Sequence, residues 1–211
     1  MNGFDSARLV EAKALRALDP YLKEESDHGA YVLTYKGALA KVMQESFGDV
    51  LRNRAGSLEA IELKAEEKWT GNLFLETFSN RNLEDAASYA KHGINPGWLY
   101  KLRADFLLYY FLDKDMLCIM HMRSLQKWAF GSDGTQAAAD AARKRNNQDS
   151  FIGLSQGRLY DYPEKEQHRY DQCNETLGRC VPVRILEEEL KPPLKRVKVI
   201  QRNLGLEQEV A

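Results

Sequence analysis

Residues 48–67 read GDVLRNRAGSLEAIELKAEE, and this stretch decides the fold. Two extended segments flank the glycine-containing turn at 54–57, which predicts a β-hairpin. In the second segment charged and apolar residues alternate, and side chains of a strand point alternately to its two faces. Glu62 and Lys64 are therefore expected on one face of the strand, and the other face carries Ile61, Leu63 and Ala65.

The position of the turn sets the register of this hairpin. A turn at 54–57 pairs Asn53 with Leu58, and counting along both strands places Asp49 directly opposite Glu62. Their Cβ atoms are then expected roughly 5 Å apart. Facing carboxylates destabilise a sheet unless a cation lies between them. The register therefore makes this pair a candidate cation site.

A second turn continues the pattern. Trp69-Thr70-Gly71 fits a three-residue hairpin loop, with Gly71 at positive φ. Lys64 then opposes Glu76 on the following strand. The prediction is a three-stranded meander over 49–53, 59–67 and 72–78, with one polar face bearing Asp49, Glu62, Lys64 and Glu76.

The rest of the chain predicts a mixed architecture. Expected helices cover 5–18 (ending at Asp19-Pro20), 37–47, 98–111, 124–130 and 133–146; further strands are expected at 30–35, 116–122, 179–186 and 194–200. This order indicates an α/β (α+β) fold with a central mixed sheet. We expect a core domain at 1–145. Residues 146–211 are expected to form a C-terminal extension or late strands packing on the core.

Composition bounds the function. The 211 residues include 30 Lys and Arg against 31 Asp and Glu, which argues against coating nucleic acid by net charge alone. The longest apolar run, 106–112, falls short of the ~18–20 residues of a membrane helix. The N-terminus has no signal-peptide pattern and the cysteine count is odd, so we expect a cytoplasmic protein with free thiols and no membrane partner.

Three carboxylates and one lysine on a sheet face suit a hard divalent cation. Mg²⁺ takes oxygen ligands and keeps several waters. A metal-bound water can attack a phosphodiester, and a neighbouring lysine can polarise that water or stabilise the charge on the phosphate. The same pattern also fits an exposed charged sheet face with one salt bridge, and geometry alone leaves both interpretations open.

The sequence resembles a known family at this point. GDV at 48–50, IELK at 61–64 and TGNLFLE at 70–76 are similar to the core of PD-(D/E)xK nucleases. The likeness is to small phage and bacterial members in which a Glu-x-Lys strand runs into a TGN-type turn. Residues 97–130 resemble the helix, strand and helix that follow, so the likeness covers roughly 45–130. The resemblance implies a restriction-endonuclease-like core of αβββαβ order, Mg²⁺ or Mn²⁺ as cofactor, and cleavage of DNA.

The resemblance also implies roles for single residues. Asp49 corresponds to the first acid of the motif, Glu62 to the second and Lys64 to the lysine, while Gly48 stands where many members have proline. The implied metal set adds Leu63 and a glutamate of the first helix. Glu11 is the first candidate for that glutamate and Glu45 the second, and Glu76 joins the catalytic set.

DNA contacts are expected around the site. Trp69, exposed at the tip of the predicted hairpin, would stack on a base or wedge a duplex, or pack on a partner subunit. Basic candidates for phosphate contact are Lys68, Arg81, Arg143, Lys144 and Arg145. Many superfamily members pair to cut both strands, so a homodimer in a bacterial or phage-infected cytoplasm is a further expectation. The alternatives are a nuclease-like fold that binds DNA or a protein without cutting, as a phage accessory or inhibitor, and a structural assembly protein.

Overall fold

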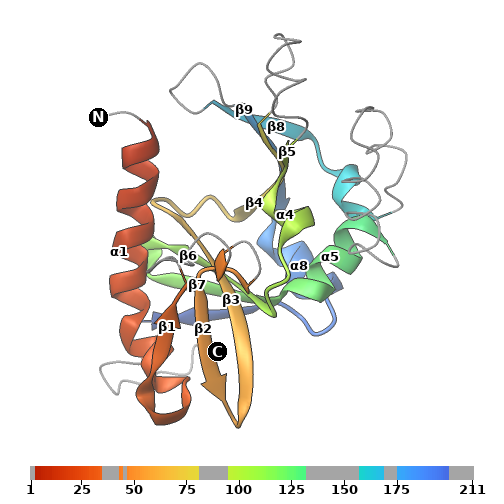
Figure 1. The fold of residues 1–211 in the computed structure, drawn as a ribbon. Helices are drawn as coiled ribbons and strands as arrows, with labels where there is room; N and C mark the ends of the chain where they lie inside the picture. The colour runs from red at the N-terminus through yellow and green to blue at the C-terminus, as the bar shows by residue number, and fades with distance from the viewer. Residues whose placement is uncertain are drawn as a thin grey trace. The chain divides into compact units, whose positions relative to one another are not determined.

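The computed structural model describes residues 3–34, 43–44, 47–80, 95–131, 157–168 and 175–199. Within them the chain is a mixed α/β protein with a six-stranded mixed sheet, a four-stranded sheet and four α-helices (Figure 1). The helices are α1 (Gly3–Glu24), α4 (Trp98–Lys101), α5 (Met122–Phe130) and α8 (Val183–Glu189). The strands are β1 (Tyr31–Leu33), β2 (Val50–Arg54), β3 (Ser57–Glu66), β4 (Asn72–Asn80), β5 (Asn95–Pro96), β6 (Phe106–Phe111), β7 (Met116–His121), β8 (Glu164–His168), β9 (Glu175–Pro182) and β10 (Lys195–Lys198).

The chain divides into two compact units. The six-strand unit comprises Asp5–Thr70, Arg103–Met122 and Leu194–Ala211, and the four-strand unit comprises Met1–Phe4, Gly71–Leu102 and Arg123–Pro193. Their sheets run β1-β2-β3-β6-β7-β10 and β5-β4-β9-β8. The boundary expected at residue 145 lies outside the described residues.

The predicted β2–β3 hairpin is confirmed, including its register. Val50 pairs with Ile61, and Asn53 pairs with Leu58. The two-residue turn puts Ala55 and Gly56 at φ values of 51° and 76°, as the right-handed twist of a two-residue hairpin requires. The Asp27 carboxylate accepts hydrogen bonds from both turn N–H groups, at 3.0 and 2.9 Å.

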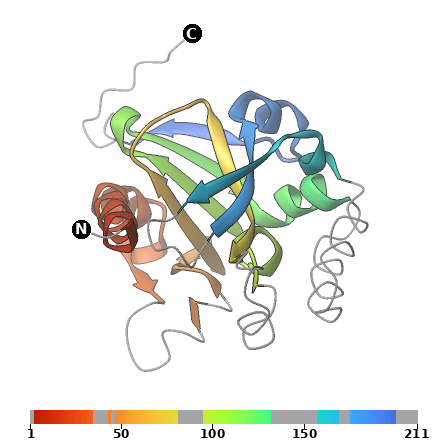
Figure 2. The same ribbon diagram turned by 90° about the horizontal axis from the view of Figure 1, so that it is seen from above.

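Helix α1 covers one face of the six-stranded sheet (Figure 1, Figure 2). The predicted end of this helix at Asp19-Pro20 is wrong, because the helix continues through Pro20 to Glu24. Pro20 removes one backbone donor, but the turns on both sides of it are anchored in the core. The side chains that join α1 to the sheet are Ala14, Leu18, Tyr21 and Leu22 from the helix and Val50, Ile61, Leu63, Leu108, Tyr110 and Leu117 from the strands.

The predicted meander is wrong at its third strand. β4 pairs with β5 and β9 in the four-strand unit, whereas β3 pairs with β6 in parallel. Gly71 has the predicted positive φ, 78°, but the turn leads to another sheet instead of back along β3. The strand that was expected to bring Glu76 beside Lys64 is therefore absent from this position. Its place is taken by β6, in which Tyr109 pairs with Lys64.

The predicted helix over 98–111 is also wrong. α4 ends at Lys101, and 106–111 form strand β6. The sequence FLLYYF is a continuous apolar run, typical of a strand buried on both faces in parallel pairing. The strand at 116–122, the helix at 124–130 and the strand at 194–200 are confirmed as β7, α5 and β10. Only 179–182 of the segment 179–186 are strand, since α8 begins at Val183, and the helix expected at 133–146 lies outside the described residues.

Helix α5 packs against the α4 region within the four-strand unit. Its buried Gln126 donates from Nε2 to the carbonyl oxygens of Leu99 and Leu102, at 3.0 and 2.9 Å. The Phe130 ring stacks on Tyr100 with centroids 4.2 Å apart. These contacts fix the end of α4 against α5 within this unit.

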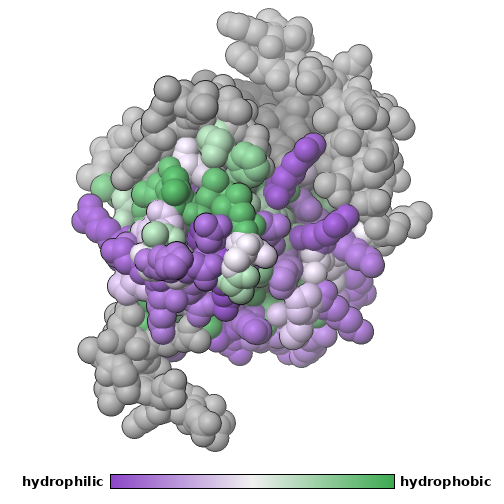
Figure 3. All heavy atoms as spheres, turned by 60° about the horizontal axis from the view of Figure 1, so that its bottom comes forward, coloured by the Kyte–Doolittle hydropathy of each residue, from purple (hydrophilic) through white to green (hydrophobic). Residues whose placement is uncertain are grey.

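No helix in the described ranges is long and apolar enough to cross a membrane. Large apolar side chains that are exposed there include Leu9, Val32, Phe47 and Leu58. Figure 3 brings the bottom of Figure 1 forward and shows hydrophilic residues over much of the described surface, with apolar residues gathered in a smaller area. Leu58 alternates with the apolar residues that face α1, so it lies on the opposite face of β3.

Candidate active site

The candidate site lies where the β2–β3 ladder ends. Beyond the pair Val50–Ile61, the backbone N–H of Asp49 still donates to the Ile61 carbonyl at 2.8 Å, and the Asp49 carbonyl accepts from the Thr34 N–H at 3.0 Å. Next along β3, the N–H of Leu63 donates to Asp49 Oδ2 at 3.0 Å. The carboxylate of Asp49 thus takes the place of a backbone acceptor that β2 no longer supplies.

Gly48 allows the chain to enter this position. It is buried, has φ +83°, and a Cβ placed on it would lie 2.7 Å from the Ile61 carbonyl oxygen. Its N–H donates to the Gln44 carbonyl at 3.0 Å. Proline would fix φ near −65° and remove that donor. Gly48 is therefore required by the backbone path here and is not interchangeable with the proline of the motif.

Gln44 is a site residue that the sequence did not indicate. Its Nε2 donates to Asp49 Oδ1 at 2.7 Å, so both oxygens of Asp49 accept a hydrogen bond from a neutral donor. It fell within a predicted helix of ordinary composition at 37–47. No charge or spacing distinguished it from other polar residues.

Glu62 and Lys64 form an ion pair on the face of β3 that points away from α1. Lys64 Nζ lies 2.5 Å from Glu62 Oε1, and Glu62 is 5% exposed. Burial, with the negative charges of Asp49 and Glu11, raises the pKa of Glu62 to about 7 against the opposing effect of Lys64. Burial by itself would lower the pKa of Lys64, but the charges of Glu62, Asp49 and Glu11 raise it above its ordinary value. Lys64 is therefore a cation at neutral pH.

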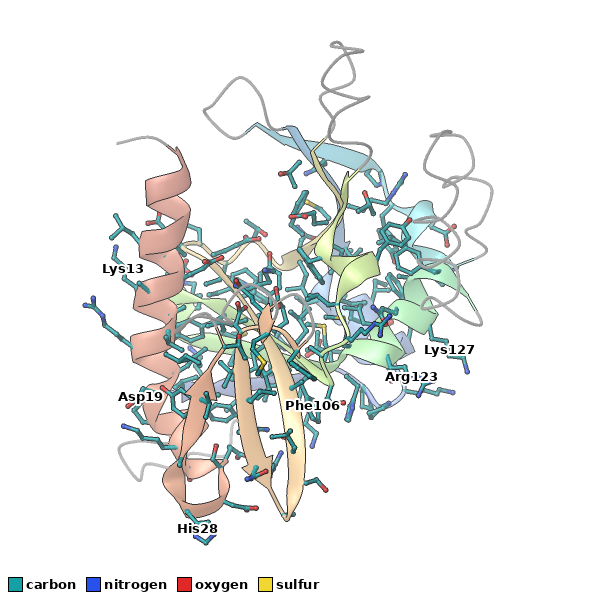
Figure 4. The ribbon with its side chains drawn as sticks, in the orientation of Figure 1. Lys13, Asp19, His28, Phe106, Arg123 and Lys127 are labelled. Carbon is teal, nitrogen blue, oxygen red and sulfur yellow. The ribbon has the colours of Figure 1, made fainter. Side chains whose placement is uncertain are left out.

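A pocket of about 440 Å³ opens beside Asp49 within the six-strand unit. Its lining comes from α1, Gln44, β2 and β3: Glu11, Ala12, Leu15, Gln44, Asp49, Val50 and Leu63. Glu11 and Asp49 thus face the same space, as expected for a glutamate of the first helix. Lys13, two residues further, lies on the outer side of α1 (Figure 4). Glu11 and Lys13 are two positions apart and point in different directions around the helix. Glu62 and Lys64 are also two positions apart, but on a strand this spacing puts both side chains on one face.

The remaining predicted site residues are not brought to this point. Glu76 lies on β4 in the other unit, and the hairpin that placed it beside Lys64 is wrong. Lys68 is exposed. Trp69 is not at a hairpin tip: its half-buried ring packs edge-on against Phe111, with centroids 4.7 Å apart. The candidates outside the described residues are Glu45, Arg81, Arg143, Lys144 and Arg145.

The described residues contain no group of three or more His, Cys, Asp or Glu side chains that could hold a metal ion. At the candidate site, Glu62 and Lys64 form an ion pair with each other. Any cation here would be held by two carboxylates with backbone oxygen and water. That is the ordinary environment of Mg²⁺, which binds proteins through one or two carboxylates and retains several waters.

Comparison of the chain with protein-family models, with curated proteins and with solved structures finds no match. The functional argument therefore rests on the site itself.

Proposed function

We propose that this chain is a metal-dependent nuclease that hydrolyses DNA phosphodiester bonds, built on a restriction-endonuclease-like core. The observation that supports it is the meeting of Asp49, Glu62 and Lys64 at the end of the β2–β3 ladder. Two acids approach each other there although their charges oppose it, since Asp49 raises the pKa of Glu62. Lys64 compensates part of this repulsion, and a bound divalent cation would compensate the rest.

Asp49 and Glu62 would hold Mg²⁺ or Mn²⁺, with Glu11 acting from the pocket wall. Leu63 could contribute only its backbone carbonyl oxygen. The donor set is all oxygen, which suits these cations and disfavours softer metals. When bound, the cation would supply Lewis-acid polarisation of the phosphate and a water of lowered pKa.

Lys64 would act as a fixed positive charge. Since its pKa is raised, it remains protonated at neutral pH and has hydrogen-bond donors but no lone pair. It can donate to a phosphate oxygen and balance the charge that develops during phosphodiester cleavage. Its contact with Glu62 holds the ammonium group on the face that carries the acids.

The test is DNA cleavage by the purified full chain. Plasmid, linear duplex and single-stranded DNA are incubated with Mg²⁺, Mn²⁺ or a chelator. We expect cleavage only with metal, and loss of cleavage in Lys64→Ala with metal binding retained. Lys13→Ala, on the outer side of α1, is the matched control and is expected to cut like wild type. Wild-type rates in Lys64→Ala would show that the assignment to this site is wrong.

One observation favours a second candidate function. Lys64 already pairs with Glu62, and the described residues hold no three-ligand group. A nuclease-like fold that binds DNA or a protein partner without cutting would need no such group. Absence of cleavage of every substrate with every metal, together with retained DNA binding in a mobility-shift assay, would support this candidate.

A further inference from the structure

We infer that Gln44 is a positioning residue that sets the orientation of the Asp49 carboxylate for a divalent cation. This inference rests on the proposed function and deepens it. The contact that carries it is the 2.7 Å hydrogen bond from Gln44 Nε2 to Asp49 Oδ1. An ionised carboxylate only accepts hydrogen bonds, so the amide group of Gln44 must present its NH₂ end to Asp49.

The Asp49 side chain is fixed at both oxygens. Leu63 holds Oδ2 from the backbone of β3, and Gln44 holds Oδ1 from the other side. Two donors to one planar carboxylate restrict its rotation, and each oxygen retains a further lone pair. These lone pairs are the ones available to a cation in the pocket that Gln44 and Asp49 both line.

The chemistry of the donor matters as much as its position. Gln44 and the Leu63 N–H are neutral, so they orient Asp49 without cancelling its charge. A lysine or arginine at the same place would also donate, but its charge would repel a divalent cation. The two acids therefore have different partners: Glu62 pairs with the charged Lys64, whereas Asp49 accepts hydrogen bonds from the neutral groups of Gln44 and Leu63.

The backbone links Gln44 to Asp49 through Gly48. The N–H of Gly48 donates to the Gln44 carbonyl at 3.0 Å, and its positive φ turns the chain so that Asp49 follows directly. Gln44 is thus joined to the residue directly before Asp49, at a position whose positive φ and close contact with the Ile61 carbonyl require glycine. This places Gln44 in a fixed relationship to the carboxylate.

The experiment measures Mn²⁺ binding to the full chain by calorimetric titration without DNA. Gln44→Met keeps the length of the side chain and removes the donor. Loss of an outer hydrogen-bond partner of a metal ligand typically weakens metal affinity about 10-fold or more, and we expect that loss here. Gln44→Lys restores a donor with positive charge, and we expect it to bind Mn²⁺ at least as weakly as Gln44→Met. The thermal midpoint without metal is recorded for each variant to verify folding.

Gln126→Met is the matched control, because Gln126 makes two hydrogen bonds inside the other unit. It should lower the metal-free thermal midpoint and leave the Mn²⁺ affinity unchanged. Wild-type Mn²⁺ affinity in both Gln44 variants would overturn this inference alone. No Mn²⁺ binding by the wild type would overturn the proposed function as well.

Discussion

The backbone N–H of Leu63 donates to Asp49 Oδ2 at 3.0 Å, across 14 positions of sequence. This contact lies one step beyond the last paired residues of β2 and β3. It holds the carboxylate of Asp49, at the end of the hairpin, against the strand that carries Glu62 and Lys64. The candidate site is thus a consequence of where the β2–β3 pairing stops.

The first prediction concerns the pH dependence of stability. Folding raises the pKa of Glu62 from 4.5 to about 7, so the folded state keeps a proton that the unfolded state loses. This contribution to stability is fully present below pH 4.5 and is lost as the pH rises through about 7. We expect metal-free Glu62→Gln, measured by urea unfolding, to gain stability relative to wild type as the pH rises over this window. Its melting temperature above the window should equal or exceed that of wild type.

Glu59→Gln is the control for this prediction, as the same substitution on the same strand. Glu59 accepts from Arg52 Nε at 2.8 Å, and the Arg52 side chain is almost fully buried. Weakening that pair should cost about 1–3 kcal/mol. A constant difference between Glu62→Gln and wild type at all pH values would contradict the role assigned to Glu62.

The second prediction concerns metal addition and removal. A metal ligand must be deprotonated, so cation and proton compete for Glu62. We expect Mg²⁺ or Mn²⁺ to raise the melting temperature of wild type above pH 7 and to do so less below it, with reversal by chelator. The shift should be smaller in Asp49→Asn and Glu62→Gln. Equal shifts in all three proteins would place the cation elsewhere.

The third prediction concerns Gly48. Gly48→Ala must adopt a positive φ and also places a Cβ 2.7 Å from a backbone oxygen. We expect it to lower the free energy of unfolding by about 3 kcal/mol or more, and to reduce Mn²⁺ affinity. Gly56→Ala also has positive φ, but nothing lies within 4 Å of its Cβ position. It should cost only about 1 kcal/mol, so equal losses in urea unfolding would argue against a close contact at Gly48.

The fourth prediction separates packing from DNA contact at Trp69. Its ring lies edge-on to Phe111, so Trp69→Ala should destabilise the chain by about 1–3 kcal/mol, and Trp69→Phe by less. Urea unfolding gives this value, and a DNA-binding titration is run on the same proteins. If Trp69 also stacks on DNA, Trp69→Ala loses DNA affinity and Trp69→Phe retains most of it. Unchanged affinity in both variants would leave packing as the role of this side chain.

The sequence by itself determined the hairpin that carries the site. The turn at Ala55-Gly56 and the alternation along β3 are local features, and together they fix the pairing of Val50 with Ile61. A shift of one residue would move charged side chains to the face that α1 covers. Glu62 and Lys64 could therefore be placed on one face from the sequence alone.

Only the tertiary structure decided what lies on the other side of β3. A positive φ at Gly71 serves a hairpin and a crossing to another sheet equally well, so the local turn could not place Glu76. The true neighbour, β6, begins at Phe106 and pairs in parallel with β3. Just before it, Asp105 Oδ2 accepts a hydrogen bond from the Ala60 N–H, across 45 positions of sequence. Gln44 was hidden for a different reason: its partner is only five residues away, but the contact depends on the positive φ that Gly48 adopts. Contacts between distant segments depend on packing of the whole chain, and they leave no pattern in the residues around either partner.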